Sequence, residues 1–422
     1  MKILVVGGGG REHAIVWKLA QSPLVDKLYC APGNGGIAQL AECVDIAAAD
    51  IDAMVAFAEK QQMDMVFVAP DDPLVMGMVD AMEKKGIRAF GPRANAAIIE
   101  GSKVFSKELM KKYHIPTANY EVFTDSTEAI EYLKQGTFPA VIKAEGLALG
   151  KGVIIAQDIH EAEKAVKDIM DDKVFGESGS RIVIEEFLTG PEVSVLAFTD
   201  GKTIVPMVSA QDHKRAYDND EGLNTGGMGT FSPSRLYTKE IADECMKTIF
   251  QPTVEAMAKE GRPFQGVLYF GLMMTKDGVK VIEYNCRFGD PETQVVLPRL
   301  KTDLVTICNA VIDRKLDTIH IEWADNAAVC VVMASGGYPV GYKKGYEITG
   351  LDTVDEMDNL VVFHAGTKEE NGRMVTNGGR VLGVTAVEEN LDKAIARAYE
   401  GVAQIQFQNA HYRKDIGIKK EI

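Results

Sequence analysis

The first hundred residues alternate between short apolar runs and stretches with helical periodicity. The run "KILVVG" at 2–7 ends in four glycines, and residues 11–22 then place apolar side chains at helical spacing. The runs "MDMVFVAP" and "IRAFGP" continue the pattern, separated by helical stretches such as "DIDAMVAFAEKQQ". This alternation predicts βαβ units, and therefore a doubly wound parallel sheet over residues 1–100.

The pattern changes beyond residue 100. Residues 120–190 combine short strand-like runs with one helical stretch, and long apolar runs such as "VLYFGLMMT" follow before residue 325. After Trp323 come short strand-like runs separated by glycine turns. We therefore expect an α/β and α+β multidomain protein, with an N-terminal domain at 1–100, a central domain at 101–325 that contains a subdomain at about 120–190, and a small α+β C-terminal domain at 326–422.

A glycine-rich loop, "AEGLALGKGVIIA", lies between two strand-like runs of that subdomain. A phosphate-binding P-loop has the spacing G-x-x-x-x-G-K-[ST] and opens a helix. Here the spacing Gly146-x-x-x-Gly150-Lys151-Gly152 is one residue short, and Gly152 stands where the hydroxyl residue belongs. Because β-branched apolar residues follow, the stretch predicts a strand–loop–strand flap.

The four N-terminal glycines resemble a dinucleotide-binding loop only in part. The third glycine of G-x-G-x-x-G is replaced by Glu12 or His13, depending on the starting glycine, and the acidic residue expected about 20 residues later is missing. This argues against a nicotinamide cofactor. The backbone amides of Gly8, Gly9 and Gly10 suit a phosphate monoester or another small anion. A tight turn without a ligand remains the alternative, and we expect His13 to be structural.

Net charge, the length of apolar runs and the spacing of the cysteines limit the kinds of partner and cofactor that we expect. The chain has 422 residues and a net charge of -15, which argues against a nucleic-acid partner. No apolar run reaches the roughly 18 residues needed to span a bilayer, so we expect no membrane partner. The six cysteines include no C-x-x-C pair. This predicts reduced thiols in a cytoplasmic protein, without a zinc or disulfide framework.

Two lysines and an acidic turn are candidates for nucleotide binding. Lys103 begins a predicted helix, and Lys143 lies inside an apolar strand, where an unpaired ammonium is unfavourable and a nucleotide phosphate would be a suitable partner. The segment "RIVIEEFLTGPEVSV" is a strand followed by an acidic turn. In a nucleotide site its backbone near Phe187 and Leu188 would read the adenine edge. Glu185 or Glu186 would bind the adenine amino group, and Glu192 would bind the ribose hydroxyls. A solvated edge strand remains the alternative.

The segment "VIEYNCRFGDPETQ" at 281–294 predicts a metal site. Since side chains alternate along a strand, Glu283 and Asn285 lie on one face. Two oxygen ligands of this kind suit Mg²⁺ that also binds phosphate oxygens and water. Arg287 continues the same face and could stabilise a phosphoryl group during its transfer, whereas Cys286 points away towards the core.

Together, the flap, the two lysines, "EEFL…PE" and "EYNCR" resemble the ATP-grasp superfamily, in which two α+β subdomains grip ATP. Within it, the chain resembles the phosphoribosylamine–glycine ligase family from end to end. The motifs that carry this resemblance are "VVGGGGREHA", "QDHKRAYDND", "NTGGMGTFSP", "NCRFGDPETQ", "ASGGYP" and "VTNGGRVLGVTA". The N-terminal domain would then be Rossmann-like, and the central domain an ATP-grasp domain with a flap subdomain.

The resemblance implies that ATP and Mg²⁺ or Mn²⁺ are bound, with Glu283 and Asn285 as metal ligands. The implied ATP-binding residues are Lys103, Lys143, Gly146, Gly150, Lys151, Gly152, Glu185, Glu186, Phe187, Leu188 and Glu192. The residues implied to face glycine and 5-phosphoribosylamine are Gly8, Gly9, Gly10, Asp212, Asn224, Thr225, Gly226, Gly227, Arg287 and Asp290. Of all these, Arg287, Asp212 and Lys143 are implied to be catalytic. Glycine would be converted to glycyl phosphate before ligation. We expect a monomer, with a dimer as the alternative.

Position 271 departs from the pattern of the ATP-grasp superfamily, and two other functions are open as alternatives to the ligase. Gly271 stands where many ATP-grasp enzymes have another metal-binding carboxylate. A different ATP-grasp ligase or a carboxylase would share the nucleotide residues but not "NTGGMG" or "TNGGRVL". A non-catalytic nucleotide-binding sensor would have no use for Arg287 and two metal ligands.

Overall fold

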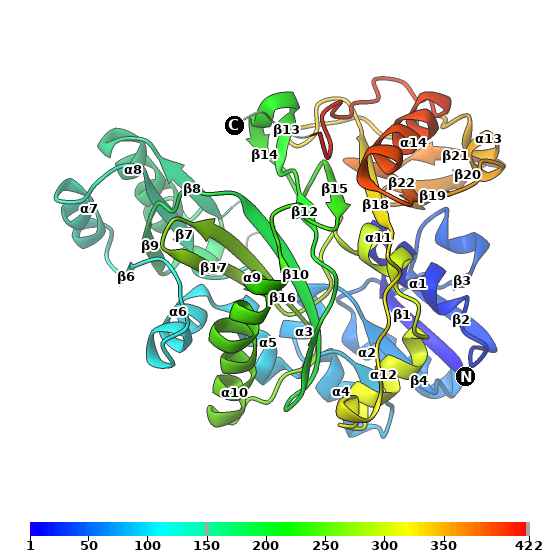
Figure 1. The fold of residues 1–422 in the computed structure, drawn as a ribbon, viewed down its shortest axis with the longest axis horizontal. Coiled ribbons are helices and arrows are strands. Elements are labelled where there is room, and N and C mark those ends of the chain that lie inside the picture. The colour runs from blue at the N-terminus through cyan, green and yellow to red at the C-terminus, as the bar shows by residue number, and fades with distance from the viewer. Residues whose placement is uncertain (148–151, 419–422) are drawn as a thin grey trace.

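The computed structural model describes residues 1–147 and 152–418. Its N-terminal sheet is entirely parallel, in the order β3-β2-β1-β4-β5, as predicted (Figure 1). From β1 the strand order runs one way to β2 and β3 and the other way to β4 and β5, so the topological switch point lies between β1 and β4. Ligands of such sheets bind at the carboxyl ends of the strands beside the switch point. The elements are β1 (Lys2–Gly7), α1 (Gly10–Leu19), β2 (Lys27–Pro32), β3 (Glu42–Cys43), α2 (Ile51–Gln61), β4 (Met65–Val68), α3 (Asp71–Val75), α4 (Met78–Lys84) and β5 (Ala89–Phe90).

Two helices, α5 (Ala94–Gly101) and α6 (Lys103–Lys112), lead into a four-stranded flap sheet of order β6-β9-β7-β8, at the left of Figure 1. The strands β7 and β8 pair antiparallel on either side of the glycine-rich loop, so the predicted strand–loop–strand arrangement is confirmed. Two helices share an apolar cluster with this sheet. The elements are β6 (Tyr120–Phe123), α7 (Ser126–Lys134), β7 (Ala140–Ala144), β8 (Val153–Ala156), α8 (Ile159–Val166) and β9 (Ile182–Glu186).

A second antiparallel sheet, of order β11-β10-β16-β17, lies between the flap sheet and the N-terminal sheet. Phe250 and Phe270 share a buried cluster with Leu4 of β1, so this sheet and the N-terminal domain have a common core. The elements are β10 (Glu192–Asp200), β11 (Ile204–Pro206), α9 (Lys239–Cys245), α10 (Gln251–Lys259), β16 (Gln265–Thr275), β17 (Gly278–Asn285), α11 (Thr293–Val296) and α12 (Leu304–Ile312).

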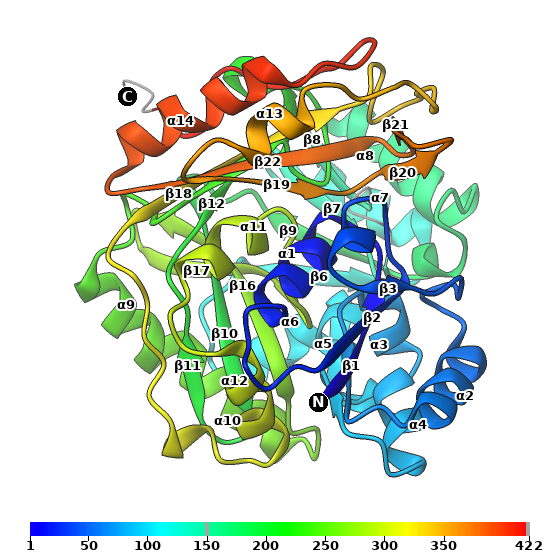
Figure 2. The ribbon, with the colours of Figure 1, turned by 90° about the vertical axis from the view of Figure 1, so that its right-hand side faces the viewer.

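The C-terminal sheet has the order β12-β15-β18-β22-β19 and is covered by α14, as Figure 2 shows. Two of its strands, β12 (Gln211–Asp212) and β15 (Gly229–Ser232), come from the middle of the chain. The sheet therefore brings a central segment against the C-terminal residues. The other elements are β13 (Arg215–Tyr217), β14 (Glu221–Asn224), β18 (Ala327–Ala334), α13 (Leu351–Asp355), β19 (Leu360–His364), β20 (Thr367–Glu370), β21 (Arg373–Thr376), β22 (Arg380–Glu388) and α14 (Leu391–Gln404).

All six cysteines are free thiols, and five of them are buried. Cys286 is fully buried in the core shared by the N-terminal and central sheets. None of the helices in the described part of the chain is long and apolar enough to cross a membrane.

Candidate functional site

A β-bulge places Glu283 among the charged side chains of Lys103, Lys143, Lys214 and Arg287, and this group of side chains below the flap sheet is called the cleft. In the pairing of β16 with β17, Gly271 lies opposite Glu283 but Leu272 lies opposite Val281, so Ile282 is an extra residue. Val281 is buried, and strict alternation would have sent Glu283 to the same buried face. The bulge shifts this alternation, so Glu283 and Asn285 are partly exposed on the cleft side.

Gly271 makes room for this carboxylate. A Cβ atom at Gly271 would lie 3.1 Å from Cγ of Glu283. Because Gly271, the residue paired with Glu283, has no side chain, it leaves space for the side chain of Glu283 in the cleft. A larger residue at position 271 would therefore press on the side chain of Glu283.

Four cations surround Glu283. The ammonium of Lys214 lies 3.6 Å from its Oε1 and 3.5 Å from Oε2 of Glu192. Burial opposes ionisation of Glu283, but the positive charges nearby hold its pKa below the usual range. These charges are Lys214, Lys143, Lys103 and Arg287. Lys214 belongs to the motif "QDHKRAYDND", but no local pattern in the sequence predicts its position between two acids.

Lys103 and Lys143 approach the cleft from different elements. Lys103, at the first position of α6, donates from Nζ to the carbonyl of Gly146 at 3.0 Å, which links the helix to the flap. Lys143 on β7 donates to the carbonyl of Ile282 at 3.2 Å. That carbonyl belongs to the bulged residue, so the same irregularity positions both a lysine and the carboxylate of Glu283. Of the flap glycines, Gly150 lies outside the described residues, as does Lys151.

Lys143 also has a protein partner that the sequence analysis did not predict, while the bound anion expected beside it stays a prediction. Its Nζ lies 2.9 Å from Oε1 of Glu185, and the Nζ of Lys107 lies 3.0 Å from Oε2 of the same carboxylate. All three side chains are buried. Burial lowers the pKa of Lys107 to about 8. Lys107 follows Lys103 by one helical turn, and this i,i+4 spacing was the overlooked signal.

The rest of the acidic turn is more exposed. Glu186 accepts a hydrogen bond from the Asn119 amide at 2.9 Å and lies 3.5 Å from the Nζ of Lys280. Phe187 is exposed and Leu188 half-buried. The backbone beyond β9 is therefore accessible, while Glu185 points inwards to the lysines.

A buried acid from α5 fixes the far end of β17. Glu100 accepts hydrogen bonds from Nδ2 of Asn285 at 3.0 Å and from the Cys286 amide at 2.7 Å. Its Oε1 also lies 3.0 Å from Nη2 of Arg287. Since the amide nitrogen of Asn285 is engaged, its oxygen is the atom left for a ligand. The sequence analysis overlooked Glu100, although an acid within the apolar helix "ANAAIIEG" was a usable signal.

Asp212 lies on the other side of the cleft. The His213 amide donates to its Oδ1 at 2.7 Å. Burial, followed by the nearby Glu292, raises the pKa of Asp212 well above its usual range. Glu292 is itself buried, and it accepts from the hydroxyls of Ser194 and Tyr269, both at 3.2 Å.

Arg380, at the start of β22, joins two loops that face Asp212. Its Nη1 donates to the carbonyls of Gly226 at 2.9 Å and Asp290 at 3.0 Å, and its Nη2 lies 3.3 Å from Oδ2 of Asp290. Gly227 has a φ of +121°, and a Cβ there would lie 2.8 Å from Oδ1 of Asp212. The structure thus brings together the predicted residues 225–227, Asp212 and Asp290, whereas Asn224 lies on an exposed hairpin. Arg380 was not predicted.

The N-terminal glycines pack against two other segments, α11 and the loop that follows β2. A Cβ at Gly10 would lie 2.7 Å from Nε2 of Gln294, and one at Gly8 would lie 2.5 Å from the carbonyl of Gly33. The amide of Gly9 donates to the Glu12 carboxylate at 2.7 Å. Part of the expected anion cradle is therefore already filled by a side chain of the protein.

His13 connects the N-terminal and C-terminal domains. Its Nδ1 accepts a hydrogen bond from the His364 amide at 2.7 Å, and burial lowers its pKa to about 3. This arrangement agrees with the structural role expected for His13.

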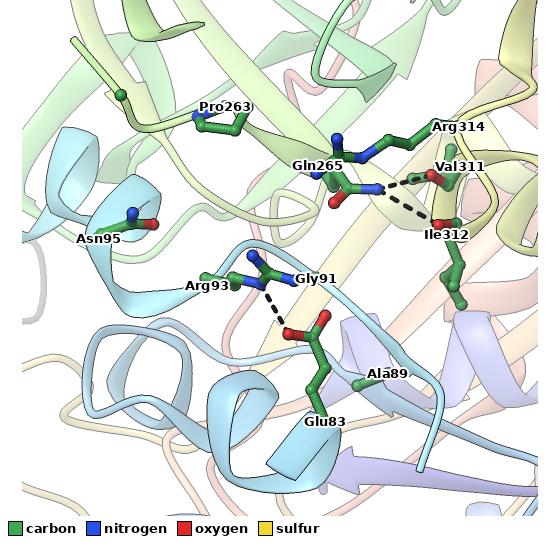
Figure 3. A pocket seen from close by; sticks show the side chains of 11 residues that line it. Glu83, Ala89, Gly91, Arg93, Asn95, Pro263, Gln265, Val311, Ile312 and Arg314 are labelled. Carbon is green, nitrogen blue, oxygen red and sulfur yellow. Dashed lines mark hydrogen bonds and ion pairs between the residues drawn. The ribbon is translucent and has the colours of Figure 1, made fainter. Parts of the chain in front are cut away.

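A cavity of about 200 Å³ lies elsewhere, between β5, the start of β16 and the end of α12 (Figure 3). Its Arg93 is paired with Glu83 at 2.6 Å, and Gln265 donates to the carbonyl of Val311 at 3.0 Å. It contains none of the lysines or acids gathered around Glu283. The cleft below the flap is therefore the candidate site.

Three family profiles match nearly the whole chain. They describe phosphoribosylglycinamide synthetase: its N domain at residues 1–100, its ATP-grasp (A) domain at 101–293 and its C domain at 328–419. The chain belongs to the phosphoribosylglycinamide synthetase family. Membership confirms the predicted superfamily and the three-part architecture.

Two similar proteins are named phosphoribosylamine–glycine ligase, and a third is named a trifunctional purine biosynthetic protein. The phosphoribosylamine–glycine ligase of Caldanaerobacter subterraneus subsp. tengcongensis is 50% identical over 416 residues, which cover 99% of each chain. The trifunctional purine biosynthetic protein adenosine-3 of Gallus gallus is 52% identical over 422 residues, 99% of this chain and 42% of that one. The structure of the Thermotoga maritima phosphoribosylamine–glycine ligase is 34% identical, with a TM-score of 0.87 and coverage of 99% and 100%.

A more distant structure shares only the fold. The biotin carboxylase domain of the Hydrogenobacter thermophilus 2-oxoglutarate carboxylase has a TM-score of 0.75 at 15% identity, covering 97% of this chain and 91% of that one. Its architecture therefore extends across enzymes with different names.

Proposed function

We propose that the chain ligates glycine to 5-phosphoribosylamine at the expense of ATP, giving glycinamide ribonucleotide, ADP and phosphate in purine biosynthesis. Full-length similarity to ligases of that name supports this function. The observation in the structure that carries it is the convergence of Lys103, Lys143 and Lys214 on the ionised Glu283 below the flap. Such a cluster suits the transfer of a phosphoryl group, which is catalysed mainly by position and charge.

In this proposal ATP lies between the flap sheet and β17. Lys103 and Lys143 bind its phosphates, and the accessible backbone near Phe187 and Leu188 reads the adenine. Glu192, at the start of β10, binds the ribose. The flap, which includes Gly146 and Gly152, covers the phosphates and excludes water from the reactive intermediate.

The residues present fit a divalent cation. Glu283 supplies an ionised carboxylate and Asn285 an amide oxygen, which are the ligands that Mg²⁺ and Mn²⁺ accept. Within residues 1–147 and 152–418, no group of three or more His, Cys, Asp or Glu side chains is arranged to hold a metal. Phosphate oxygens and water would therefore complete the coordination. When bound, the cation neutralises phosphate charge.

The chemistry divides a difficult substitution into two steps. The glycine carboxylate attacks the γ-phosphorus of ATP, so ADP leaves and glycyl phosphate forms. The amine of 5-phosphoribosylamine then attacks the acyl carbon, and phosphate leaves. Arg287 and the lysines stabilise charge on the phosphoryl group. We assign Asp212 to accept the proton that the amine loses, since burial and the nearby Glu292 raise its pKa and make it a stronger base than an ordinary aspartate.

Substrate-dependent release of ADP tests the proposal. The enzyme is incubated with ATP and Mg²⁺, with glycine present or omitted, and 5-phosphoribosylamine is generated in place from ribose 5-phosphate and ammonia. We expect ADP release only with both partners. Release that depends on bicarbonate rather than glycine would instead identify a carboxylase, and binding of ATP without any release would identify a sensor.

A further inference from the structure

Lys107 is buried beside the proposed nucleotide site without facing its cleft. It is 2% exposed, and its Nζ lies 3.0 Å from Oε2 of Glu185. It also donates to Oγ1 of Thr117 at 2.8 Å, and Thr117 in turn donates to the carbonyl of Val281 at 2.7 Å. Lys107 therefore links α6 to β9 and, through Thr117, to the strand that carries Glu283.

Glu185 is shared between two lysines. Its two oxygens lie 2.9 Å and 3.0 Å from the ammonium groups of Lys143 and Lys107, and its carboxylate is 5% exposed. A buried carboxylate left with one counter-ion attracts that ion strongly, because little water screens the pair. If Glu185 had only Lys143 as a partner, it would compete with the phosphates of a nucleotide for the same ammonium.

We propose that Lys107 is a positioning residue that acts as the permanent counter-ion of Glu185, so that Lys143 is free to bind the anionic phosphate chain of the nucleotide. This inference rests on the proposed nucleotide-binding function of the cleft. Because Lys107 neutralises part of the charge of Glu185, Glu185 attracts Lys143 less strongly. The hydrogen bond to Thr117 holds Lys107 in place when Lys143 moves from Glu185 to the phosphate.

The first test compares variants of two lysines on α6. Lys107→Met should raise the Kd for Mg·ADP, measured by calorimetry, on the order of tenfold, as expected when a charge-assisted contact is weakened. Lys107→Arg keeps the charge and should bind more tightly than Lys107→Met. Lys112→Met is the matched control: its exposed side chain pairs with Glu260 on the surface, and its Kd should stay within about twofold of the wild type. An unchanged Kd in Lys107→Met would overturn the proposal.

A double-mutant cycle with Glu185→Gln distinguishes the counter-ion role from a direct contact. Once the carboxylate is neutral, Lys143 has no competing anion, so adding Lys107→Met to Glu185→Gln should change the Kd for Mg·ADP by less than about twofold. Equal losses in both backgrounds would show that Lys107 acts on the nucleotide itself, and would refute the counter-ion role. The double variant buries no unpaired carboxylate, so it provides the comparison if Lys107→Met alone does not fold.

Two further readouts separate this role from a structural one and from the proposed function. The KM for glycine should stay within about twofold in Lys107→Met while the KM for ATP rises, whereas general damage to the fold would raise both. Mg·ADP binding is measured without glycine or 5-phosphoribosylamine. Loss of the proposed ligase activity in the wild type would therefore leave the test of Lys107 intact.

Discussion

The two halves of the cleft are built differently. In the nucleotide half, Lys103, Lys107 and Lys143 extend from regular helices and strands, and two of them share the buried carboxylate of Glu185. In the substrate half, Asp212 and Asp290 lie on short strands or loops that Arg380 holds together. We propose that the first half binds phosphates and that the second binds the amino groups of glycine and phosphoribosylamine. The two halves are built from different elements, so each can be tested by its own variants.

The largest effect is expected in the nucleotide half, from Glu283→Ala. The variant removes the only ionised oxygen ligand proposed for the cation and leaves Lys214 without one of its two acids. Turnover should fall about a thousandfold or more, in line with the several kcal/mol that such sites supply. The measurement is ADP release at saturating substrates. Glu260→Ala, which removes a half-buried acid that pairs with Lys112 far from Glu283 in the sequence, is the control, and comparable turnover in the two variants would contradict the assignment.

Asp212→Asn should affect the substrate half alone. Loss of a general base lowers kcat by about a hundredfold to ten-thousandfold, while the Kd for Mg·ADP should not change. Because only the carboxylate accepts a proton and its pKa is raised by burial and Glu292, wild-type kcat should fall on acidification at a higher pH than for an ordinary aspartate. This acidic limb of the pH profile should disappear in the variant; its persistence would assign the limb to another group.

Arg380→Lys should have a smaller effect in the same half. A lysine cannot reproduce the forked contacts to Gly226 and Asp290. We expect the KM for glycine or phosphoribosylamine to rise about tenfold, as for the loss of one charge-assisted hydrogen bond. An equal rise in the KM for ATP would show that the two halves are coupled.

The two halves also differ in how far the sequence predicted them. The strand carrying Glu283 and Asn285 and the flap hairpin were recognisable because strand alternation and glycine spacing are local. The bulge at Ile282 was not, since the register depends on β16. Lys107 gave a local signal, but its partner Glu185 lies on another strand.

The substrate half depends on contacts between distant segments. Arg380 meets Gly226 and Asp290 only because β12 and β15 join the C-terminal sheet. Strands of two or four residues carry too little periodicity to predict such pairing. The family motifs therefore marked these residues without indicating their partners, and the domain boundary near 326 stays a prediction.

The smallest predicted effect concerns stability rather than turnover. It tests the contact between His13 of α1 and the C-terminal sheet. His13 of α1 is neutral in the folded protein because burial lowers its pKa to about 3, whereas an unfolded histidine has a pKa near 6.5. Between these two values the unfolded chain binds a proton that the folded chain does not, so stability falls as the pH decreases. The contribution of His13 is about 1.4 kcal/mol per pH unit well below 6.5.

His13→Asn keeps an acceptor for the His364 amide and removes the titration. The free energy of unfolding, measured with denaturant between pH 7 and pH 5, should therefore decrease less steeply in the variant than in the wild type. His320→Asn, which replaces an exposed histidine, should leave the wild-type slope unchanged. If His13→Asn retained the full slope, the acid sensitivity would have to arise from His213 and His364, whose pKa values burial lowers to about 4. The ring of His13 would then not be the group that responds to acid.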